Sequence, residues 1–254
     1  MACGDDCAPL SNATAAAIEL MHCASLVHDD LPCFDNADMR RGQPSVHKAF
    51  GERLAVLAGD ALIVLAYQTL SADIHHRPER ARPLLRGLSQ AVGMPAGIVA
   101  GQAWESESIV DLRQYQRAKT GALFAAATSL GAASAGQSPE DWEALGNWLG
   151  EAYQVADDIR DVAADAAELG KPTGQDLCHG RPSAVSTLGL SGALERFSEL
   201  MAQALGSIPD CRGEKALRSL LRAESQRLIP SHMLSKPQAS KQSGAQRELL
   251  SRSL

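Results

Sequence analysis

Apolar residues recur along most of this chain at the three- and four-residue spacing of amphipathic α-helices. The spacing predicts helices over 12–28, 54–70, 84–105, 111–131, 142–165, 184–205 and 213–228. Ser11 or Asn12 is expected to cap the first of them, since short polar side chains bond the free N–H groups of a first helical turn. Polar stretches separate the helices at 29–48 and 168–182, which contain Gly and Pro, and at 75–82, which contains Pro78. No stretch alternates as a half-buried strand does, so the pattern predicts an all-α fold.

Composition supports this class. Of 254 residues, 45% are hydrophobic, 21% are charged and only 4% are aromatic. These proportions exclude a disordered chain, and the scarcity of strand-forming aromatic residues argues against an all-β fold. Short loops without a linker indicate one helical domain over 1–234, and the polar residues 235–254 are expected to form a loose tail.

The net charge of −6 gives no basic surface, so no nucleic-acid partner is expected. No unbroken run of ~18 apolar residues predicts a transmembrane segment. The first residues lack the basic start and apolar core of a signal peptide. Six scattered cysteines without a C-x-x-C pair suggest reduced thiols, and together these features predict a cytoplasmic protein.

Two clusters of carboxylates stand out. They are Asp29, Asp30 and Asp35, and Asp157, Asp158 and Asp161. Asp157 and Asp161 share one helix face, where their charges repel unless a cation lies between them, and hard divalent cations prefer such oxygen ligands. Asp29 and Asp35 can reach one ion only if Pro32 breaks the helix. A solvated acidic face is the alternative, but apolar neighbours in both helices favour a cavity.

Cationic side chains follow both clusters in the sequence. Arg40 and Arg41 come after the first, Lys119 opens a later helix, and Lys171 and Arg181 come after the second. Each alone reads as an ordinary surface cation. Beside two candidate Mg²⁺ clusters they indicate a diphosphate site, because Mg²⁺ commonly binds carboxylates together with substrate phosphates.

These motifs resemble those of the trans-type isoprenyl diphosphate synthases, the polyprenyl synthetase family. The matching positions are Asp29-Asp30-x-x-x-x-Asp35, Arg40-Arg41-Gly42, Lys119-Thr120, Gln154, Asp157-Asp158-x-x-Asp161 and Gly170-Lys171. One D-D-x-x-D is a weak signal, whereas both motifs with these cations in this order are specific. The likeness runs from about residue 13 to about residue 189.

The resemblance implies a helical bundle around a central cavity, usually a homodimer. It implies head-to-tail condensation of isopentenyl diphosphate with an allylic diphosphate, using two or three Mg²⁺ ions or Mn²⁺ in their place. In such a site Asp29, Asp35 and Asp157 would bind metal directly, and Asp30, Asp158 and Asp161 would support them.

The same resemblance assigns roles to the other matched residues. Arg40, Lys119 and Lys171 would hold the allylic diphosphate, and His22 and Arg41 would touch isopentenyl diphosphate. Thr120 and Gln154 would face the reacting carbons. Arg181 stands where the family usually has Lys, with the charge kept and the geometry changed.

The expected floor of the cavity lies one turn before Asp29, at Ala24 and Ser25. In this family small residues there let the product grow, although small residues also suit close helix packing. The floor and the Pro32-Cys33 insertion resemble bacterial geranylgeranyl diphosphate synthases. The run from Gly101 to Glu107 resembles the form found in carotenoid and bacteriochlorophyll pathways of purple bacteria.

One departure from the family pattern concerns the second substrate. Family members carry a Gly-Gly-Lys-Arg-like segment well before the first motif, but here only 28 residues precede Asp29 and none is Lys or Arg. The chain is therefore expected to be shortened at its N-terminus. This leaves two alternatives to an active prenyltransferase: a non-catalytic or regulatory subunit, and a class I terpene cyclase. Asp161 occupies the place where cyclases carry Ser or Thr, which disfavours the cyclase.

Overall fold

A computed structural model of the protein describes residues 2–4, 7–107, 111–163 and 183–229. Its long helices are α1 (Ala8–Asp29), α3 (Glu52–Asp73), α4 (Ala81–Val92), α7 (Ala122–Ser134), α8 (Glu140–Ala163), α11 (Ala184–Gly206) and α12 (Glu214–Leu228). Its short elements are β1 (Met39–Arg40), β2 (Gln43–Pro44), α2 (Val46–Phe50), η1 (Ile74–His76), η2 (Pro78–Arg80), α5 (Ile98–Trp104), α6 (Leu112–Gln116) and η3 (Arg117–Gly121), a π-helical turn. The predicted all-α class is confirmed.

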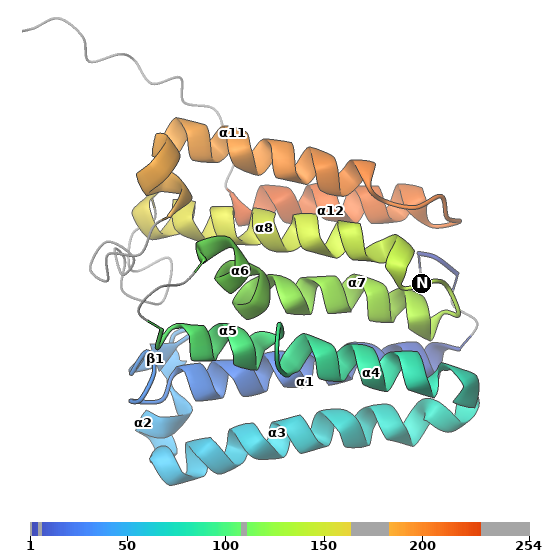
Figure 1. Ribbon diagram of the computed structural model, residues 1–254, viewed down its shortest axis with the longest axis horizontal. Coiled ribbons are helices and arrows are strands. Elements are labelled where there is room, and N and C mark those ends of the chain that lie inside the picture. The colour runs from blue at the N-terminus through green and yellow to red at the C-terminus, as the bar shows by residue number, and fades with distance from the viewer. Residues whose placement is uncertain (1, 5–6, 108–110, 164–182, 230–254) are drawn as a thin grey trace, which may run out of the picture.

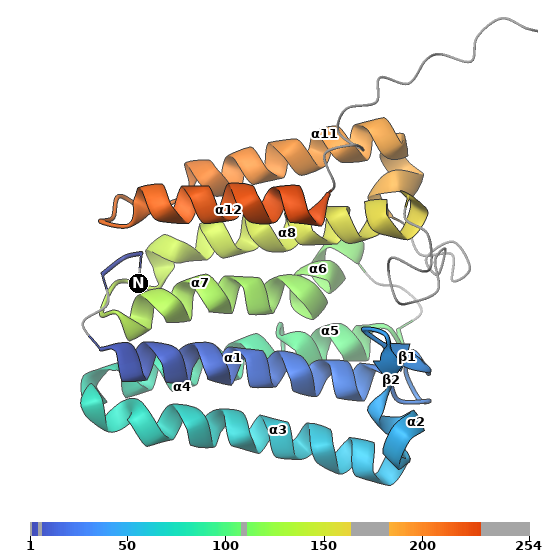
Figure 2. The ribbon, with the colours of Figure 1, turned by 180° about the vertical axis from the view of Figure 1, so that it is seen from behind.

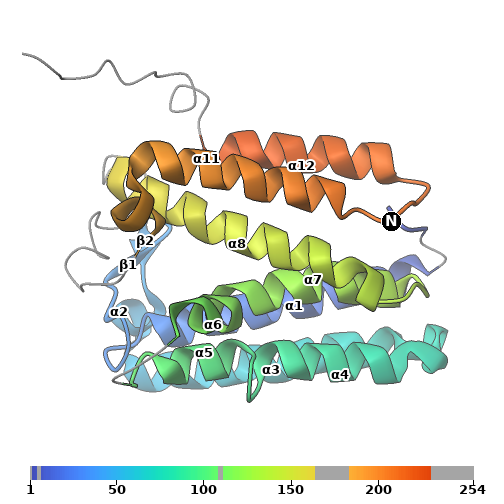
Figure 3. The same cartoon turned by 45° about the horizontal axis from the view of Figure 1, so that its top comes forward.

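The long helices lie side by side in a layered bundle (Figures 1 and 2). From one edge to the other the order is α3, then α1 and α4, then α7, then α8, and finally α11 and α12. The main packing partners are α1 with α3, α7 with α8, and α8 with α11. Tilting the molecule shows α11 and α12 together beyond α8 (Figure 3). The short elements α2, β1, β2, α5 and α6 gather at one end of the bundle (Figure 1).

Two apolar cores hold these layers together. Met21 of α1, Leu70 of α3 and Leu88 of α4 are buried in one core, which α7 completes. Ile159 of α8 and Phe197 of α11 are buried in the other, which α12 completes. Because α7 contributes Leu130 to the first core and Ala132 to the second, where it meets α8, this helix joins the two halves of the molecule.

Two glycines allow neighbouring helices to approach each other closely. A Cβ atom at Gly146 of α8 would lie 2.5 Å from the backbone of Ala125 in α7, so only glycine permits this approach. A Cβ atom at Gly59 would lie 2.1 Å from the His28 ring. Gly59 therefore provides room for a side chain of α1 within a continuous α3, rather than breaking that helix.

Several predicted boundaries differ from the structure. The first helix begins at Ala8 with Cys7 before it, and the expected cap at Ser11 or Asn12 is wrong because Pro9 suits a first helical turn. The helix expected over 84–105 is two helices, α4 and α5, because Gly and Pro interrupt it between 93 and 97.

Other differences concern loops. The polar connector 75–82 contains turns of 3₁₀ helix, and the loop 29–48 contains a two-stranded antiparallel ribbon, β1 with β2, which is too short to give an alternating pattern. The tail at 235–254 and the loop 168–182 lie outside the described residues, so the 1–234 domain boundary stays a prediction.

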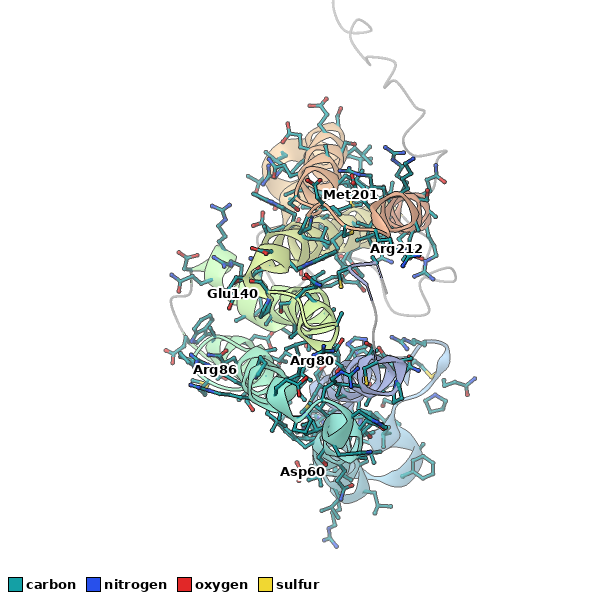
Figure 4. The ribbon with its side chains drawn as sticks, turned by 90° about the vertical axis from the view of Figure 1, so that its right-hand side faces the viewer. Asp60, Arg80, Arg86, Glu140, Met201 and Arg212 are labelled. Carbon is teal, nitrogen blue, oxygen red and sulfur yellow. The ribbon has the colours of Figure 1, made fainter. Side chains whose placement is uncertain are left out.

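The sequence predicts no transmembrane segment, but one helix among the described residues is long and apolar enough to cross a membrane by length and composition alone. The stretch Glu52–His76 reaches a mean hydropathy of 1.6 over 18 residues, of which 22% are buried. Asp60 interrupts the unbroken apolar run that the sequence criterion required, and its side chain points outward at the edge of the bundle (Figure 4). The same helix exposes Leu54, Leu57, Val64 and Leu65.

Candidate metal and diphosphate site

The first acidic cluster forms where α1 ends. The helix stops at Asp29, and the chain folds back so that the Asp35 N–H donates to the Asp29 carbonyl over 3.0 Å. This turn contains Pro32, as the sequence predicted. Carboxylate oxygens of Asp29, Asp35 and Glu105 then lie within 4.8 Å of one another. The break in the helix therefore brings together the two carboxylates that a regular helix would separate.

The hairpin β1–β2 presents two arginines to this cluster. Its turn is Arg41-Gly42, with φ of 52° and 75°, the left-handed conformation that a tight two-residue hairpin requires. The Arg40 guanidinium donates to both carboxylate oxygens of the buried Asp30 and lies 3.9 Å from Asp29. Burial works against the charge of Arg40, but the carboxylates of Asp30, Asp29 and Asp35 outweigh it and raise the pKa of Arg40.

Arg41 points to a different neighbour. Its guanidinium Nη2 lies 3.4 Å from Nε2 of His22 on α1. Burial lowers the pKa of His22, and the nearby Arg41 and Arg40 lower it further, while Glu19 opposes the shift. The two residues that the family resemblance assigned to the second substrate are therefore adjacent, and the imidazole favours its neutral form.

Lys119 reaches the first cluster from η3. Its ammonium Nζ lies 3.2 Å from Asp29 Oδ1 and 2.5 Å from Glu105 Oε1. Burial disfavours the charge, but Asp29, Tyr115 and Glu105 outweigh this penalty and raise the pKa of Lys119 above its ordinary value. Glu105 was not predicted as a site residue. In the sequence, the Gly101–Glu107 run that contains Glu105 indicates only a likeness to purple-bacterial enzymes.

Close backbone contacts position the π-helical turn that carries Lys119. A Cβ atom at Gly101 of α5 would lie 2.4 Å from the Lys119 backbone nitrogen. On the α8 side, a Cβ atom at Gly150 would lie 2.8 Å from the Cα of Gly121. Two glycines thus let α5 and α8 approach this turn from both sides. Single π-helical turns recur at functional sites, where they re-aim side chains.

The second cluster lies within the unbroken helix α8 and is held by polar donors. Thr120 Oγ1 donates to Gln154 Oε1 over 3.2 Å, and Gln154 Nε2 donates to Asp158 Oδ1 over 3.0 Å. The backbone N–H of Ala184 donates to the other oxygen of Asp158 over 2.7 Å. Both oxygens of this buried carboxylate therefore accept from the protein itself. The supporting role that the family resemblance assigns to Asp158 stays a prediction.

The other acids of α8 have different surroundings. Asp157, with a side chain 34% exposed, accepts from Arg160 Nη2 over 3.0 Å, and the Arg160 guanidinium lies 5.6 Å from the centre of the Tyr153 ring. Asp161 is buried. Asp157 is therefore the most accessible carboxylate of this cluster.

One dipeptide links the two clusters. Lys119 contacts Asp29 and Thr120 contacts Gln154, so adjacent residues of η3 touch the end of α1 and the last turns of α8. The structure thus joins the cationic, polar and acidic residues that the sequence proposed, although they lie far apart in the chain. Lys171 and Arg181 lie outside the described residues, so their roles stay predictions.

The candidate floor of the cavity is only partly accessible. Ala24 is buried, whereas Ser25 is half-buried and its hydroxyl donates to the His22 carbonyl over 2.8 Å. A large groove of about 850 Å³ lies elsewhere, between α4, α7 and α8. Its walls include Arg86 and Glu140, which lie on the same side of the molecule in Figure 4, but not Lys119 or Asp29. The groove borders η3 at Arg117 and Ala118, but no residue of the two acidic clusters lines it.

The first cluster fits a hard divalent cation. Three convergent carboxylates supply oxygen donors, and Asp35 is exposed enough to leave room for water, which Mg²⁺ tends to retain. Arg40 and Lys119 beside them match the charge of a phosphate group. Asp29 and Asp35, with Asp157 from α8, are the residues that would hold the metal.

An all-helical bundle with two carboxylate clusters, linked by a Lys-Thr dipeptide and with two arginines beside the first cluster, is typical of the isoprenoid synthases. Residues 2–221 match the polyprenyl synthetase family, and the chain belongs to that family. It is 53% identical to a geranylgeranyl diphosphate synthase of Cereibacter sphaeroides over 91% of this chain and 81% of the relative. It is 51% identical to the Rhodobacter capsulatus enzyme of the same name over 90% and 79%.

Solved structures agree with this assignment. An FPP/GFPP synthase from Zymomonas mobilis superposes with a TM-score of 0.70 at 34% identity, covering 85% of this chain and 81% of the other. A geranyltransferase from Helicobacter pylori, solved with magnesium and isoprenyl diphosphate, superposes with a TM-score of 0.70 at 31% identity, covering 87% and 74%. The expected helical bundle of the isoprenoid synthases is confirmed.

Proposed function

We propose that this protein is a Mg²⁺-dependent prenyltransferase that condenses isopentenyl diphosphate with an allylic diphosphate to form geranylgeranyl diphosphate. The observation that carries the proposal is the contact of Lys119 with Asp29 and of Thr120 with Gln154, which links both acidic clusters through one dipeptide. The relatives favour this function over a non-catalytic subunit and over a terpene cyclase, because two relatives at 53% and 51% identity are named geranylgeranyl diphosphate synthases.

The reaction breaks the bond between the allylic C1 and the diphosphate oxygen and forms a carbon–carbon bond to isopentenyl diphosphate. Arg40 and Lys119 bind the departing diphosphate, and Lys171 is proposed to join them. Two or three Mg²⁺ ions held by Asp29, Asp35 and Asp157 would neutralise that group and make it a better leaving group. The oxygens of Thr120 and Gln154 stabilise positive charge on the allylic carbons.

The second substrate then supplies the new bond. His22 and Arg41, which are adjacent, are proposed to contact the diphosphate of isopentenyl diphosphate, with Arg181 as a further cation. The double bond of this substrate attacks the allylic C1, and the resulting cation loses a proton to the released diphosphate. The product is longer by one isoprene unit.

Labelled isopentenyl diphosphate, farnesyl diphosphate and Mg²⁺ test the function directly. The proposal requires a twenty-carbon diphosphate as product. Binding of the allylic substrate without turnover would instead identify a non-catalytic subunit. A hydrocarbon formed from the allylic substrate alone would identify a cyclase.

Product length is proposed to depend on the half-buried Ser25 more than on the buried Ala24. Ser25→Phe should shift the product to fifteen carbons by filling the floor of the cavity when geranyl diphosphate is the substrate. Ser129→Phe, on α7 and among residues lining the separate groove, serves as a control for added bulk. A twenty-carbon product from Ser25→Phe would contradict the assignment of the floor.

The exposed apolar face of α3 supports a homodimer. Leu54, Leu57, Ala61 and Val64 follow the three- and four-residue spacing of a helix–helix seam, and all are exposed. A second copy packing on this seam would cover them, and the outward-facing Asp60 disfavours hydrocarbon as the alternative partner. Leu57→Glu should give monomers in light scattering, whereas Leu220→Glu, at an exposed position on α12, should leave dimers.

A cytoplasmic location and a role in carotenoid synthesis complete the proposal. The six cysteines are scattered without a C-x-x-C pair, which suits a reducing compartment. The Gly101–Glu107 run supports the pathway assignment through its likeness to purple-bacterial enzymes.

A further inference from the structure

We propose that Glu105 is a positioning residue that sets where the ammonium of Lys119 lies in the diphosphate site. The proposal rests on the proposed function, because it concerns a residue acting through Lys119 on a bound diphosphate. It assigns a role to a carboxylate that the two aspartate motifs do not include.

Glu105 lies at the meeting point of three short elements. Its side chain is 15% exposed and accepts from Gln102 of α5 over 2.7 Å, from the Tyr115 hydroxyl of α6 over 2.5 Å, and from Lys119 of η3 over 2.5 Å. Oε2 accepts the first of these bonds, and Oε1 accepts the other two. Donors from α5 and α6 therefore hold the carboxylate in place independently of Lys119.

The flexible side chain of Lys119 needs such a fixed partner. Its ammonium lies between two carboxylates, 3.2 Å from Asp29 and 2.5 Å from Glu105. A divalent cation held by Asp29 would offset the attraction of that carboxylate for the ammonium. Glu105 then keeps the ammonium beside the cluster, where a diphosphate can accept from it, instead of letting the long side chain explore other rotamers.

A competing assignment is that Glu105 is itself a metal ligand, since its oxygen lies within 4.8 Å of ligand atoms of Asp29 and Asp35. Its existing contacts favour the positioning role, because both of its oxygens already accept from Gln102, Tyr115 or Lys119. The two assignments differ in one measurable respect. A positioning residue acts only when Lys119 is present, whereas a metal ligand acts without it.

A double-mutant cycle separates them. The variants are Glu105→Gln, Lys119→Met and the double variant, and Glu107→Gln is the matched control because Glu107 is an exposed acid two residues away. The probe is an allylic thiolodiphosphate, in which sulfur replaces the bridging oxygen so that it binds without reacting. Calorimetry in saturating Mg²⁺ gives its dissociation constant for each variant.

Glu105→Gln should weaken binding of the probe about tenfold, and Lys119→Met should weaken it at least as much. The double variant should bind no more weakly than Lys119→Met alone, and Glu107→Gln should match the unmodified protein. If the dissociation constant of the double variant rises by the product of the two single-variant factors, the positioning role is overturned in favour of direct metal binding. A Glu105→Gln variant that binds as well as the unmodified protein would also overturn it.

Two further variants guard against misfolding. Glu105→Asp keeps the charge on a shorter side chain and should recover part of the lost affinity, which a loss of packing alone would not give. If Glu105→Gln fails to fold, Tyr115→Phe is used instead. It removes one of the donors that hold Glu105 and should weaken binding of the probe, by less than tenfold. Unchanged affinity in Tyr115→Phe and no recovery in Glu105→Asp would each contradict the proposal. Failure of the unmodified protein to bind the probe would overturn the proposed function instead.

Discussion

The two acidic clusters are similar in sequence and different in construction. The first lies at the broken end of α1, where the chain folds back and brings Asp29 and Asp35 together. The second lies within an unbroken α8, where Asp158 accepts from Gln154 and from the backbone of Ala184. In the first cluster, side-chain cations from other elements face the carboxylates, whereas in the second, amide donors fix one carboxylate in place.

A repeated aspartate pair therefore does not imply repeated roles. Arg40 and Lys119 compensate charge at the first cluster, so its carboxylates can exchange cationic partners when a metal and a diphosphate bind. Asp158 instead anchors the start of α11 to α8 through neutral donors, and only its neighbour Asp157 is accessible. Substitutions at the first cluster should therefore change chemistry, and substitutions at Asp158 should change stability.

The largest expected effect comes from removing one negative charge at either direct-ligand position. Asp29→Asn and Asp157→Asn should each lower kcat by about a thousandfold or more, because a metal clamp stabilises the transition state by several kcal/mol. Steady-state kinetics with labelled isopentenyl diphosphate measure this loss. Full activity in Asp157→Asn would show that the second cluster does not hold metal.

A smaller effect is expected from displacing the turn that joins the clusters. In Gly101→Ala the new Cβ would meet the Lys119 backbone nitrogen at 2.4 Å, so η3 must shift and kcat should fall about 10- to 100-fold. Gly131→Ala is the control, because a Cβ atom there meets nothing within 4 Å and Ala favours the helix. Equal kinetics in both variants would argue against a tightly positioned Lys119.

The comparison can also be tested through stability. Asp158→Ala leaves the Gln154 amide and the Ala184 N–H without their acceptor, so the free energy of unfolding should fall by about 1–3 kcal/mol. Denaturant unfolding without Mg²⁺ measures it. Asp157→Ala, at a more exposed carboxylate, should change the unfolding free energy much less. The opposite ranking would reverse the roles assigned to these neighbours.

The smallest expected effect is a pH dependence from His22. Its pKa in the folded protein is lowered below 6.5, so the unfolded chain binds more protons in this range. Stability from this group is complete above about pH 7.5 and declines as the pH falls through the unfolded value. The difference in Tm between the unmodified protein and His22→Gln, followed from pH 8 to pH 5, should show this slope. A constant difference would contradict the assigned shift.

The sequence predicted the parts of this site that depend on local rules. Pro32 indicated the break that brings Asp35 to Asp29, and helical spacing predicted the long helices within a few residues. The family motif indicated Lys119 and Thr120. The contact of Lys119 with Glu105 was not predictable, because it depends on how α5 packs on η3 through Gly101.

Two other features were missed for physical reasons. The ribbon β1–β2 has strands of two residues, too short for an alternating pattern, and its turn places a non-glycine residue, Arg41, at positive φ. Gly59 and Asp60 interrupt the apolar run of α3, so an unbroken-run criterion does not recognise its full length. In the structure Gly59 accommodates His28, and the helix continues through both residues.

The central claim is that both clusters bind one diphosphate across the Lys119–Thr120 link. Calorimetry of an allylic thiolodiphosphate in Mg²⁺ tests it most directly, with Asp35→Asn, Asp157→Asn and the double variant. Each single variant should weaken binding at least tenfold, and the double variant should bind more weakly still, because each cluster makes its own contacts with the one ligand. Unchanged affinity in either single variant would contradict the claim.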